Sequence, residues 1–162
     1  MMTTQIDQNS TEKPVITMSR VFDAPRDVVW KAWTDPKHVT QWWGGEGFTS
    51  PVCEMDVRVG GAWHQIMQFP DGTKITMDFV YTEVDPPKRL SWRNAVTQPN
   101  GPPSLLQTLS FEDLGDGRTK WDLVALAESF EQRDIAARMG FAGMVTQGLD
   151  RLAKHLAAAE RV

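Results

Sequence analysis

The sequence has a single cysteine, Cys53, so an intramolecular disulfide is impossible and a reducing cytoplasm is the expected location. Its 17 Lys and Arg residues are scattered along the chain and are outnumbered by 21 Asp and Glu residues. Without a basic stripe to neutralise phosphates, nucleic acid is excluded as a partner. The longest apolar runs are only a few residues long, which predicts no membrane span, and residues 1–13 lack an apolar stretch of signal-peptide length.

What remains is enough for one globular domain. The chain has 162 residues, of which 41% are hydrophobic, and it carries a net charge of −4. Residues 1–13 are polar, and we expect them to form a disordered tail. No internal repeat or Gly/Ser linker divides the remainder, so residues 14–160 are expected to form a single domain.

The N-terminal part of that domain predicts a strand followed by two short helices. The β-branched run Val15–Phe22 is typical of a strand. Pro25 fits a first helical position, and the apolar residues after it follow a helical spacing up to Trp33. Asp35 and Pro36 give a second helix-start signal, as N-cap and first-turn residue, for a helix that ends near Trp42.

The central part predicts strands separated by turns. Proline, glycine and aspartate clusters bound each apolar segment, a pattern typical of an antiparallel meander. The expected strands are Val52–Val57, Ala62–Phe69, Lys74–Val84, Arg89–Asn94, a segment marked by Leu105, Leu109 and Phe111, and Thr119–Leu126.

The C-terminal part changes to a helical period. Apolar residues recur at steps of three and four from Ile135 to Leu156, which predicts one helix of about 25 residues with Gly140 inside it. A sheet with one polar face and a single amphipathic helix buries both apolar faces by curling around that helix. The sequence therefore predicts an α+β fold.

Several short motifs resemble the SRPBCC (START-like, Bet v 1-like) superfamily, in particular its branch of homologues of the activator of heat-shock-protein-90 ATPase. The similarity runs from about Pro14 to Ala158. The motifs are Phe22-Asp23-Ala24-Pro25 with the following Val28–Pro36, Trp42-Trp43-Gly44, Gly60-Gly61-Ala62-Trp63, Asp85–Leu90 and Leu149-Asp150-Arg151-Leu152.

The resemblance implies a helix-grip fold, in which a seven-stranded antiparallel sheet curls around the C-terminal helix and two short helices follow the first strand. Members of the family commonly keep a cavity for a hydrophobic small molecule between sheet and helix. One position departs from the family: a Gly-Trp pair often precedes the Leu-Asp-Arg-Leu segment, where this chain has Met144-Val145. A smaller side chain there would enlarge or reshape the cavity.

Strand alternation and helical period together predict which side chains face this space. Aromatic and methionine side chains dominate the set, and two glutamines share the inward parity, each of which would need a ligand, a water or a neighbouring side chain as partner. Solid core packing is the alternative for each member. Trp42 and Trp43 are expected at the cavity entrance. The candidate ligand-binding residues are Trp63, Gln65, Met67, Met77, Phe79, Trp92, Gln107, Leu109, Trp121, Met139, Ala142 and Val145.

No catalytic residue or metal ligand is predicted. The three histidines, His38, His64 and His155, lack the spacing of a metal site. Cys53 would be a nucleophile only beside a histidine. An acid or base would have to be one of the carboxylates Glu54, Asp56, Asp78 and Glu128. Alternation places Asp78, like Asp122, on the solvent face, whereas the face that Glu54 and Asp56 share is not determined. Gly44-Gly45-Glu46-Gly47 lacks the context of a phosphate-binding loop.

The favoured function is therefore non-enzymatic binding of a small hydrophobic or aromatic molecule, lipid-like or polyphenol-like, with no cofactor. The family name implies an alternative, a co-chaperone that binds a heat-shock ATPase. A third hypothesis is a cyclase or hydrolase, because some superfamily members are enzymes. A monomer or a weak homodimer is expected.

Overall fold

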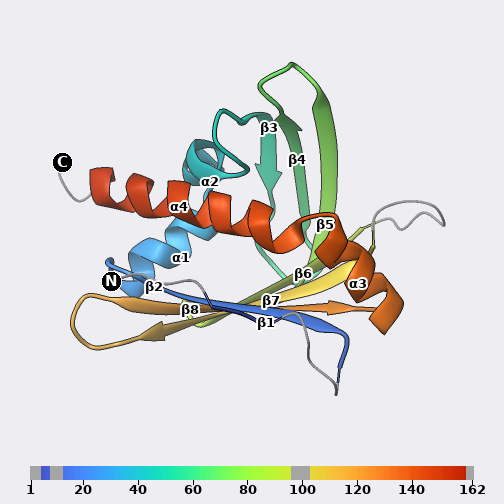
Figure 1. Ribbon diagram of the computed structural model, residues 1–162. Coiled ribbons are helices and arrows are strands. Elements are labelled where there is room, and N and C mark those ends of the chain that lie inside the picture. The colour runs from blue at the N-terminus through green and yellow to red at the C-terminus, as the bar shows by residue number, and fades with distance from the viewer. Residues whose placement is uncertain (1–4, 8–12, 96–102, 160–162) are drawn as a thin grey trace.

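The computed structural model describes residues 5–7, 13–95 and 103–159 (Figure 1). The described chain contains a curled antiparallel sheet, two short helices after its first long strand, and two helices at the C-terminal end. The strands are β1 Gln5–Asp7, β2 Val15–Phe22, β3 Thr49–Met55, β4 Ala62–Gln68, β5 Lys74–Asp85, β6 Arg89–Asn94, β7 Leu105–Asp113 and β8 Thr119–Ala127, and the helices are α1 Arg26–Thr34, α2 Pro36–Trp42, α3 Phe130–Arg138 and α4 Phe141–Ala159.

The sheet order is β1-β2-β8-β7-β6-β5-β4-β3, and every neighbouring pair is antiparallel. The seven expected strands and the α+β class are confirmed. The eighth strand, β1, lies inside the segment expected to be a disordered tail, where Gln5–Asp7 pair with Thr17–Ser19 of β2. The sequence pattern did not predict β1, because this strand has three residues with one apolar side chain, Ile6, and so shows no alternation of apolar and polar positions. The other residues of that segment, except Lys13, lie outside the described ranges.

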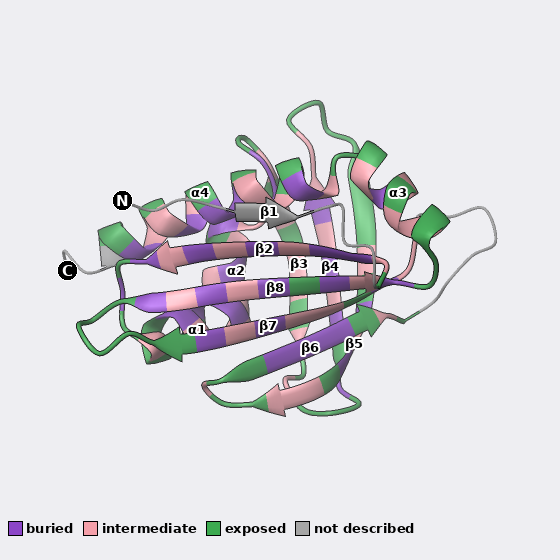
Figure 2. Cartoon of the chain, turned by 60° about the horizontal axis from the view of Figure 1, so that its bottom comes forward, coloured by how far each residue is buried: buried purple, intermediate pink, exposed green. Residues whose placement is uncertain are grey.

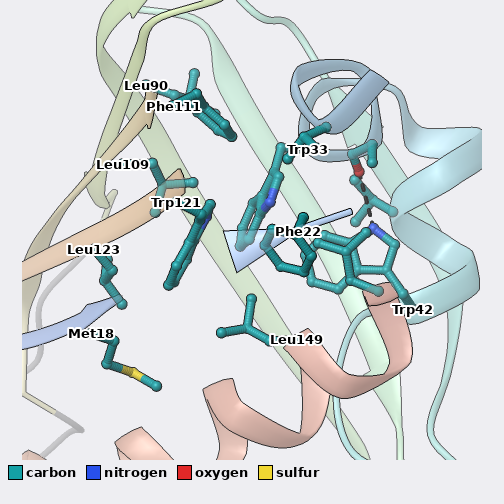
Figure 3. Close-up of a cluster of buried hydrophobic side chains, with 14 of the residues drawn as sticks. Met18, Phe22, Trp33, Trp42, Leu90, Leu109, Phe111, Trp121, Leu123 and Leu149 are labelled. Carbon is teal, nitrogen blue, oxygen red and sulfur yellow. Dashed lines mark hydrogen bonds between the residues drawn. The ribbon is translucent and has the colours of Figure 1, made fainter. Parts of the chain in front are cut away.

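The sheet curls so that α4 lies along its concave side (Figure 1). Alternation along the strands places one set of side chains against the helix and the other on the outer face, and this is visible as alternating burial along β2 and β8 (Figure 2). Outside, Ser19 donates a hydrogen bond to Asp122 at 2.6 Å. Inside, Phe22, Trp121 and Leu149 belong to one buried cluster (Figure 3).

The two short helices close one end of the concave face. Asp35 accepts a hydrogen bond from the backbone N–H of Lys37 at 2.9 Å and is the N-cap of α2, as predicted. Pro25 is the N-cap residue of α1, one position before the predicted place. The Trp42 indole N–H donates to the Ala32 carbonyl at 3.0 Å, which joins the two helices (Figure 3).

The prediction of one long C-terminal helix is wrong. Helix α3 ends at Arg138, and α4 starts at Phe141. Gly140 lies between them with a φ of +86°, and its N–H donates to the Ala137 carbonyl, so the glycine ends α3 in a left-handed conformation. The apolar periodicity continues across this break, because Ile135, Met139 and Ala142 keep a helical spacing in the sequence although the helix is interrupted between them.

Replacing the two nearby glycines by alanine should have opposite effects. Gly140→Ala should lower the free energy of unfolding by about 1–2 kcal/mol, because a side chain there must adopt a left-handed backbone. Gly143→Ala should raise it by about 0.5–1 kcal/mol, because Gly143 lies in α4 with open space where its Cβ would be. Urea unfolding of both variants measures this, and equal effects would contradict the helix break.

Adjacent side chains of α4 attach that helix to two other elements. Asp150 accepts a hydrogen bond from the guanidinium of Arg20 of β2 at 2.7 Å, and the Arg20 side chain is only 8% exposed. Arg151 donates to the carbonyls of Trp43 at 2.8 Å and Gly45 at 2.9 Å, with longer bonds to the carbonyls of Gly44 and Gln41. These carbonyls lie in the last turn of α2 and directly after it, where a cation is favoured by the helix dipole. The Leu149-Asp150-Arg151-Leu152 segment therefore fixes α4 to β2 and α2.

Removing the Arg151 guanidinium should weaken this attachment. We expect Arg151→Ala to lower the free energy of unfolding by about 2 kcal/mol, since hydrogen bonds from a charged donor contribute roughly 1.5–3 kcal/mol. Lys154→Ala is the matched control, because Lys154 is exposed on the same helix and should change stability by less than about 0.5 kcal/mol. Chemical denaturation compares the two variants, and equal stability would contradict the role of Arg151.

Candidate functional site

A cavity of about 190 Å³ lies between the concave face of the sheet, α4 and the end of α2. Strands β4 to β8 supply one wall, the first half of α4 supplies the opposite wall, and the α1–α2 region closes one end. The lining residues are Trp33, Trp42, Trp43, Gly44, Met67, Met77, Phe79, Trp92, Gln107, Leu109, Trp121, Leu123, Phe141, Met144, Val145, Gly148 and Leu149.

Stacked indoles form part of the cavity wall. The Trp33 ring is nearly parallel to that of Trp121, with centroids 5.8 Å apart and planes 19° apart (Figure 3), and to that of Trp92, at 6.0 Å and 28°. Trp42 meets Trp33 edge to face at 4.6 Å. Such pairs add to stability beyond the apolar area that they bury. The aromatic wall is therefore built in advance of any ligand.

The polar groups of the lining are few. Gln107 is its only polar side chain apart from the indole N–H groups, and its amide makes no hydrogen bond with any described residue. The N–H groups of Trp33, Trp92 and Trp121 are buried and also find no acceptor within the described ranges. In contrast, Trp42 donates to Ala32. These three indole N–H groups are enclosed by the protein and are therefore not available to a molecule in the cavity, whereas Gln107 belongs to the lining.

Eight of the twelve candidate residues line the cavity: Met67, Met77, Phe79, Trp92, Gln107, Leu109, Trp121 and Val145. The other four candidate residues do not line the cavity, and the reason differs between them. Trp63 and Ala142 point into the concave interior as predicted, but they are buried in the core beside the cavity. Gln65 is fully buried on the same face, and Met139 lies outside.

Gln65 obtains its partners from neighbouring side chains. Its Oε1 accepts the indole N–H of Trp63 at 2.9 Å, and its Nε2 donates to Ser50 Oγ at 2.8 Å. The Cys53 thiol also approaches Oε1, at 3.5 Å. Of the three partner sources that the sequence left open, a neighbouring side chain is the one found for Gln65. Gln65 is therefore a structural residue between β3 and β4.

Met139 lies outside the cavity because of the break at Gly140. As the C-cap residue of α3 it is 63% exposed, and it borders a second hollow of about 240 Å³ at the α3–α4 junction. Phe141 and Met144 line both spaces, so they separate the cavity from this outer hollow. Sequence pattern missed both residues, since the start of α4 could not be located without the helix break.

The helix-end residues Trp42 and Trp43 line the cavity together with Gly44, and their place at its entrance stays a prediction. Trp33 of α1 also forms part of the cavity wall. Carbonyl groups of Gly44 and Gly45 point to Arg151. Carbonyl oxygens cannot bind an anion, which agrees with the prediction that this glycine-rich segment is not a phosphate-binding loop.

The carboxylates that were considered as acids or bases lie away from the cavity. Glu54, Asp56, Asp78 and Glu128 are exposed, and Asp122 faces outward toward Ser19. This answers which face Glu54 and Asp56 share: it is the solvent side. None of these groups is in the lining.

Two of the three histidines are in contact, which their spacing in the sequence did not predict. His38 Nδ1 of α2 lies 2.9 Å from His155 Nε2 of α4, and burial together with the neighbouring His38 lowers the pKa of His155 below its ordinary value. His64 pairs with Asp78 on the outer face. Among the described residues, no group of three His, Cys, Asp or Glu side chains is arranged to hold a metal ion. The histidine pair joins α2 to α4.

Cys53 is not activated as a nucleophile. It is half-buried, and burial raises the pKa of its thiol to about 11. The thiol therefore stays protonated at neutral pH.

Alkylation by iodoacetamide should report this raised pKa. At pH 8 we expect Cys53 to react about a hundredfold more slowly than the thiol of an unstructured cysteine peptide, whose pKa is near 8.5. The rate should rise about tenfold per pH unit up to pH 10, because the thiolate fraction is inversely proportional to the proton concentration below the pKa. Urea-unfolded protein is the control and should react like the peptide. A rate that levels off by pH 9 would contradict the raised pKa.

The sheet topology and the position of the cavity indicate the structural class of the protein. A curled antiparallel sheet that grips a C-terminal helix defines the helix-grip proteins of the SRPBCC superfamily. More narrowly, the chain belongs to the family described as "Activator of Hsp90 ATPase homolog 1-like protein", whose family model matches residues 23–157. The resemblance seen in the sequence motifs is thereby confirmed.

Solved bacterial structures have the same fold. A protein from Nitrosomonas europaea is 23% identical, with a TM-score of 0.84 over 95% of this chain and 100% of its own. A protein from Arthrobacter aurescens is 25% identical, with a TM-score of 0.84 over 95% and 91%. A protein from Rhodobacter sphaeroides is 23% identical, with a TM-score of 0.84 over 96% and 99%.

No curated protein matches the sequence. Within the described residues, each helix is too short or too polar to cross a bilayer.

Proposed function

We propose that this protein binds a small hydrophobic molecule in the cavity between the sheet and α4, without converting it chemically. The observation that carries the proposal is the lining itself: Gln107 is its one polar side chain beyond the indoles, and the described lining contains no acidic, basic, hydroxyl or thiol side chain. Ligand pockets are typically apolar with a few polar groups that orient the ligand.

The size of the cavity supports a ligand rather than a packing defect. An apolar space of about 150 Å³ stays free of water and binds benzene, and this cavity measures about 190 Å³. Its walls lose dispersion contacts while it is empty, because no atoms face them across the gap. A molecule of matching shape restores those contacts and is bound without any charge interaction. A space of this size accommodates a single ring with a short substituent and is too small for a two-chain lipid.

The lining argues against catalysis for the same reason. General acid–base and nucleophilic mechanisms need a titratable or nucleophilic group within hydrogen-bond reach of the substrate. The single thiol of the sequence, that of Cys53, lies outside the lining and has a raised pKa. Binding without turnover is what these side chains support.

Filling the cavity should abolish binding. Isopropylbenzene is a suitable probe, and at ten times its dissociation constant it should raise the melting temperature of the protein by about 3–5 °C, since the ligand then stabilises the fold by about 1.4 kcal/mol. Val145→Trp places an indole at the position where relatives often carry tryptophan, and it should reduce affinity at least tenfold. The matched control is Val124→Trp on β8, whose valine is 41% exposed and outside the lining.

Binding that Val145→Trp leaves intact would locate the probe elsewhere and overturn the proposal. Absence of any shift with a panel of neutral one-ring and two-ring aromatic compounds would also overturn it. The chaperone-binding role that the family name implies would then become the leading hypothesis.

A further inference from the structure

The next inference rests on the proposed function and concerns the length of the ligand. Beside the cavity, the outer hollow at the α3–α4 junction has a volume of about 240 Å³, which is comparable with the volume of the cavity itself, about 190 Å³. Helix α3 and the first turn of α4 meet there, at one end of α4 (Figure 1). A ligand that used both spaces would be longer than one that fills the cavity alone.

The outer hollow is apolar although it is open to solvent. Its described lining contains no charged or hydrogen-bonding side chain. Met139 is 63% exposed at its rim, whereas Leu105 is buried at its base. Apolar surface that remains in contact with water in a hollow is typical of a binding site. Besides Phe141 and Met144, the lining residues are Pro103, Leu105, Ala136, Met139 and Gly140.

The wall between the two spaces is thin and movable. Among the described residues, Phe141 and Met144 are the two that line both the cavity and the outer hollow. They are three positions apart in the first turn of α4, so their side chains are neighbours on the helix surface. Met144 is 38% exposed, and an unbranched methionine side chain changes its conformation easily. A rotation of Met144 therefore connects the cavity with the outer hollow at a small energetic cost.

A single molecule that occupies both spaces has an advantage over two separate molecules. The loss of translational and rotational freedom on binding is incurred once, whereas apolar surface is buried in both spaces. The flat indole faces of Trp33, Trp92 and Trp121 lie on the cavity side and suit an aromatic ring. The outer hollow is mainly aliphatic and is reached past Met144, which suits a narrow, unbranched chain.

We propose that the outer hollow is the second compartment of the ligand site, and that the ligand is an uncharged, elongated molecule with one aromatic ring and an unbranched alkyl tail. The ring lies in the cavity, and the tail passes the displaced Met144 and lies against Leu105 and Met139. An ionised group in either compartment would lose its hydration without compensation, because neither described lining contains a charged side chain.

Methionine methyl signals report on the two compartments separately. Met67 and Met77 line the cavity alone, Met139 lines the outer hollow alone, and Met55 lines neither. In ¹H–¹³C NMR spectra of protein labelled at its methionine methyl groups, n-propylbenzene should shift the signals of Met67 and Met77. The longer n-hexylbenzene should shift these signals and also those of Met139 and Met144. The signal of Met55 is the internal control and should stay in place.

Dissociation constants measured by tryptophan fluorescence give an independent test. Each buried methylene strengthens binding about fourfold, so n-hexylbenzene, with three more methylenes, should bind about tenfold or more tightly than n-propylbenzene after the displacement of Met144. Met139→Glu places a carboxylate in the outer hollow. It should weaken n-hexylbenzene binding about fivefold and leave n-propylbenzene binding unchanged, which also shows that the variant is folded. The matched control is Val59→Glu, because Val59 is likewise 63% exposed and lines neither space.

The outcomes distinguish this proposal from the proposed function. If both probes shift Met67 and Met77, but n-hexylbenzene leaves Met139 unshifted and Met139→Glu changes neither affinity, the second compartment is overturned while the proposed function stands. If n-hexylbenzene shifts Met139 but not Met67 and Met77, although n-propylbenzene shifts both of these, the outer hollow is a separate site and the proposal is overturned. A lower sedimentation coefficient for Met139→Glu than for the unaltered protein would show that a second copy of the chain covers the hollow, with the same consequence. If neither probe shifts Met67 or Met77, the proposed function itself fails.

Discussion

The attachment of α4 at Asp150 and Arg151 is the constraint on which the rest of the structure depends. Asp150 binds the guanidinium of Arg20 in β2, and Arg151 binds carbonyls that follow α2, so adjacent side chains fix the helix to opposite sides of the concave face. This attachment lies at the middle of α4. Val145 and Gly148 in the N-terminal half of the helix line the cavity, and these small residues leave the space unfilled. A cavity in this position follows from a fixed helix with small side chains.

Much of the fold could be predicted from the sequence, because alternation and turn residues are local signals. The strands Val15–Phe22 and Arg89–Asn94 have the predicted bounds, and the α2 cap at Asp35 has the predicted geometry. Two features could not be predicted in this way. The edge strand at Gln5–Asp7 depends on pairing with β2, and the break at Gly140 depends on a φ value that apolar spacing does not record.

The candidate site was predictable in outline for the same reason. Parity correctly placed Met77, Phe79, Leu109 and Trp121 on the concave side, and all four line the cavity. Parity does not say whether an inward side chain meets empty space or another side chain. Gln65 and Gln107 show this limit: only the fold reveals that Ser50 and Trp63 satisfy the first and that no described residue satisfies the second. Contacts between distant segments, such as His38 with His155, are equally invisible to periodicity.

Xenon binding tests the central claim, an open apolar cavity, most directly, because xenon occupies such spaces without any hydrogen bond. A crystal of the protein pressurised with xenon should show an anomalous scattering peak enclosed by Leu109, Trp121 and Val145. An interior filled by the chain's own side chains, with no xenon peak between α4 and the sheet, would contradict the account.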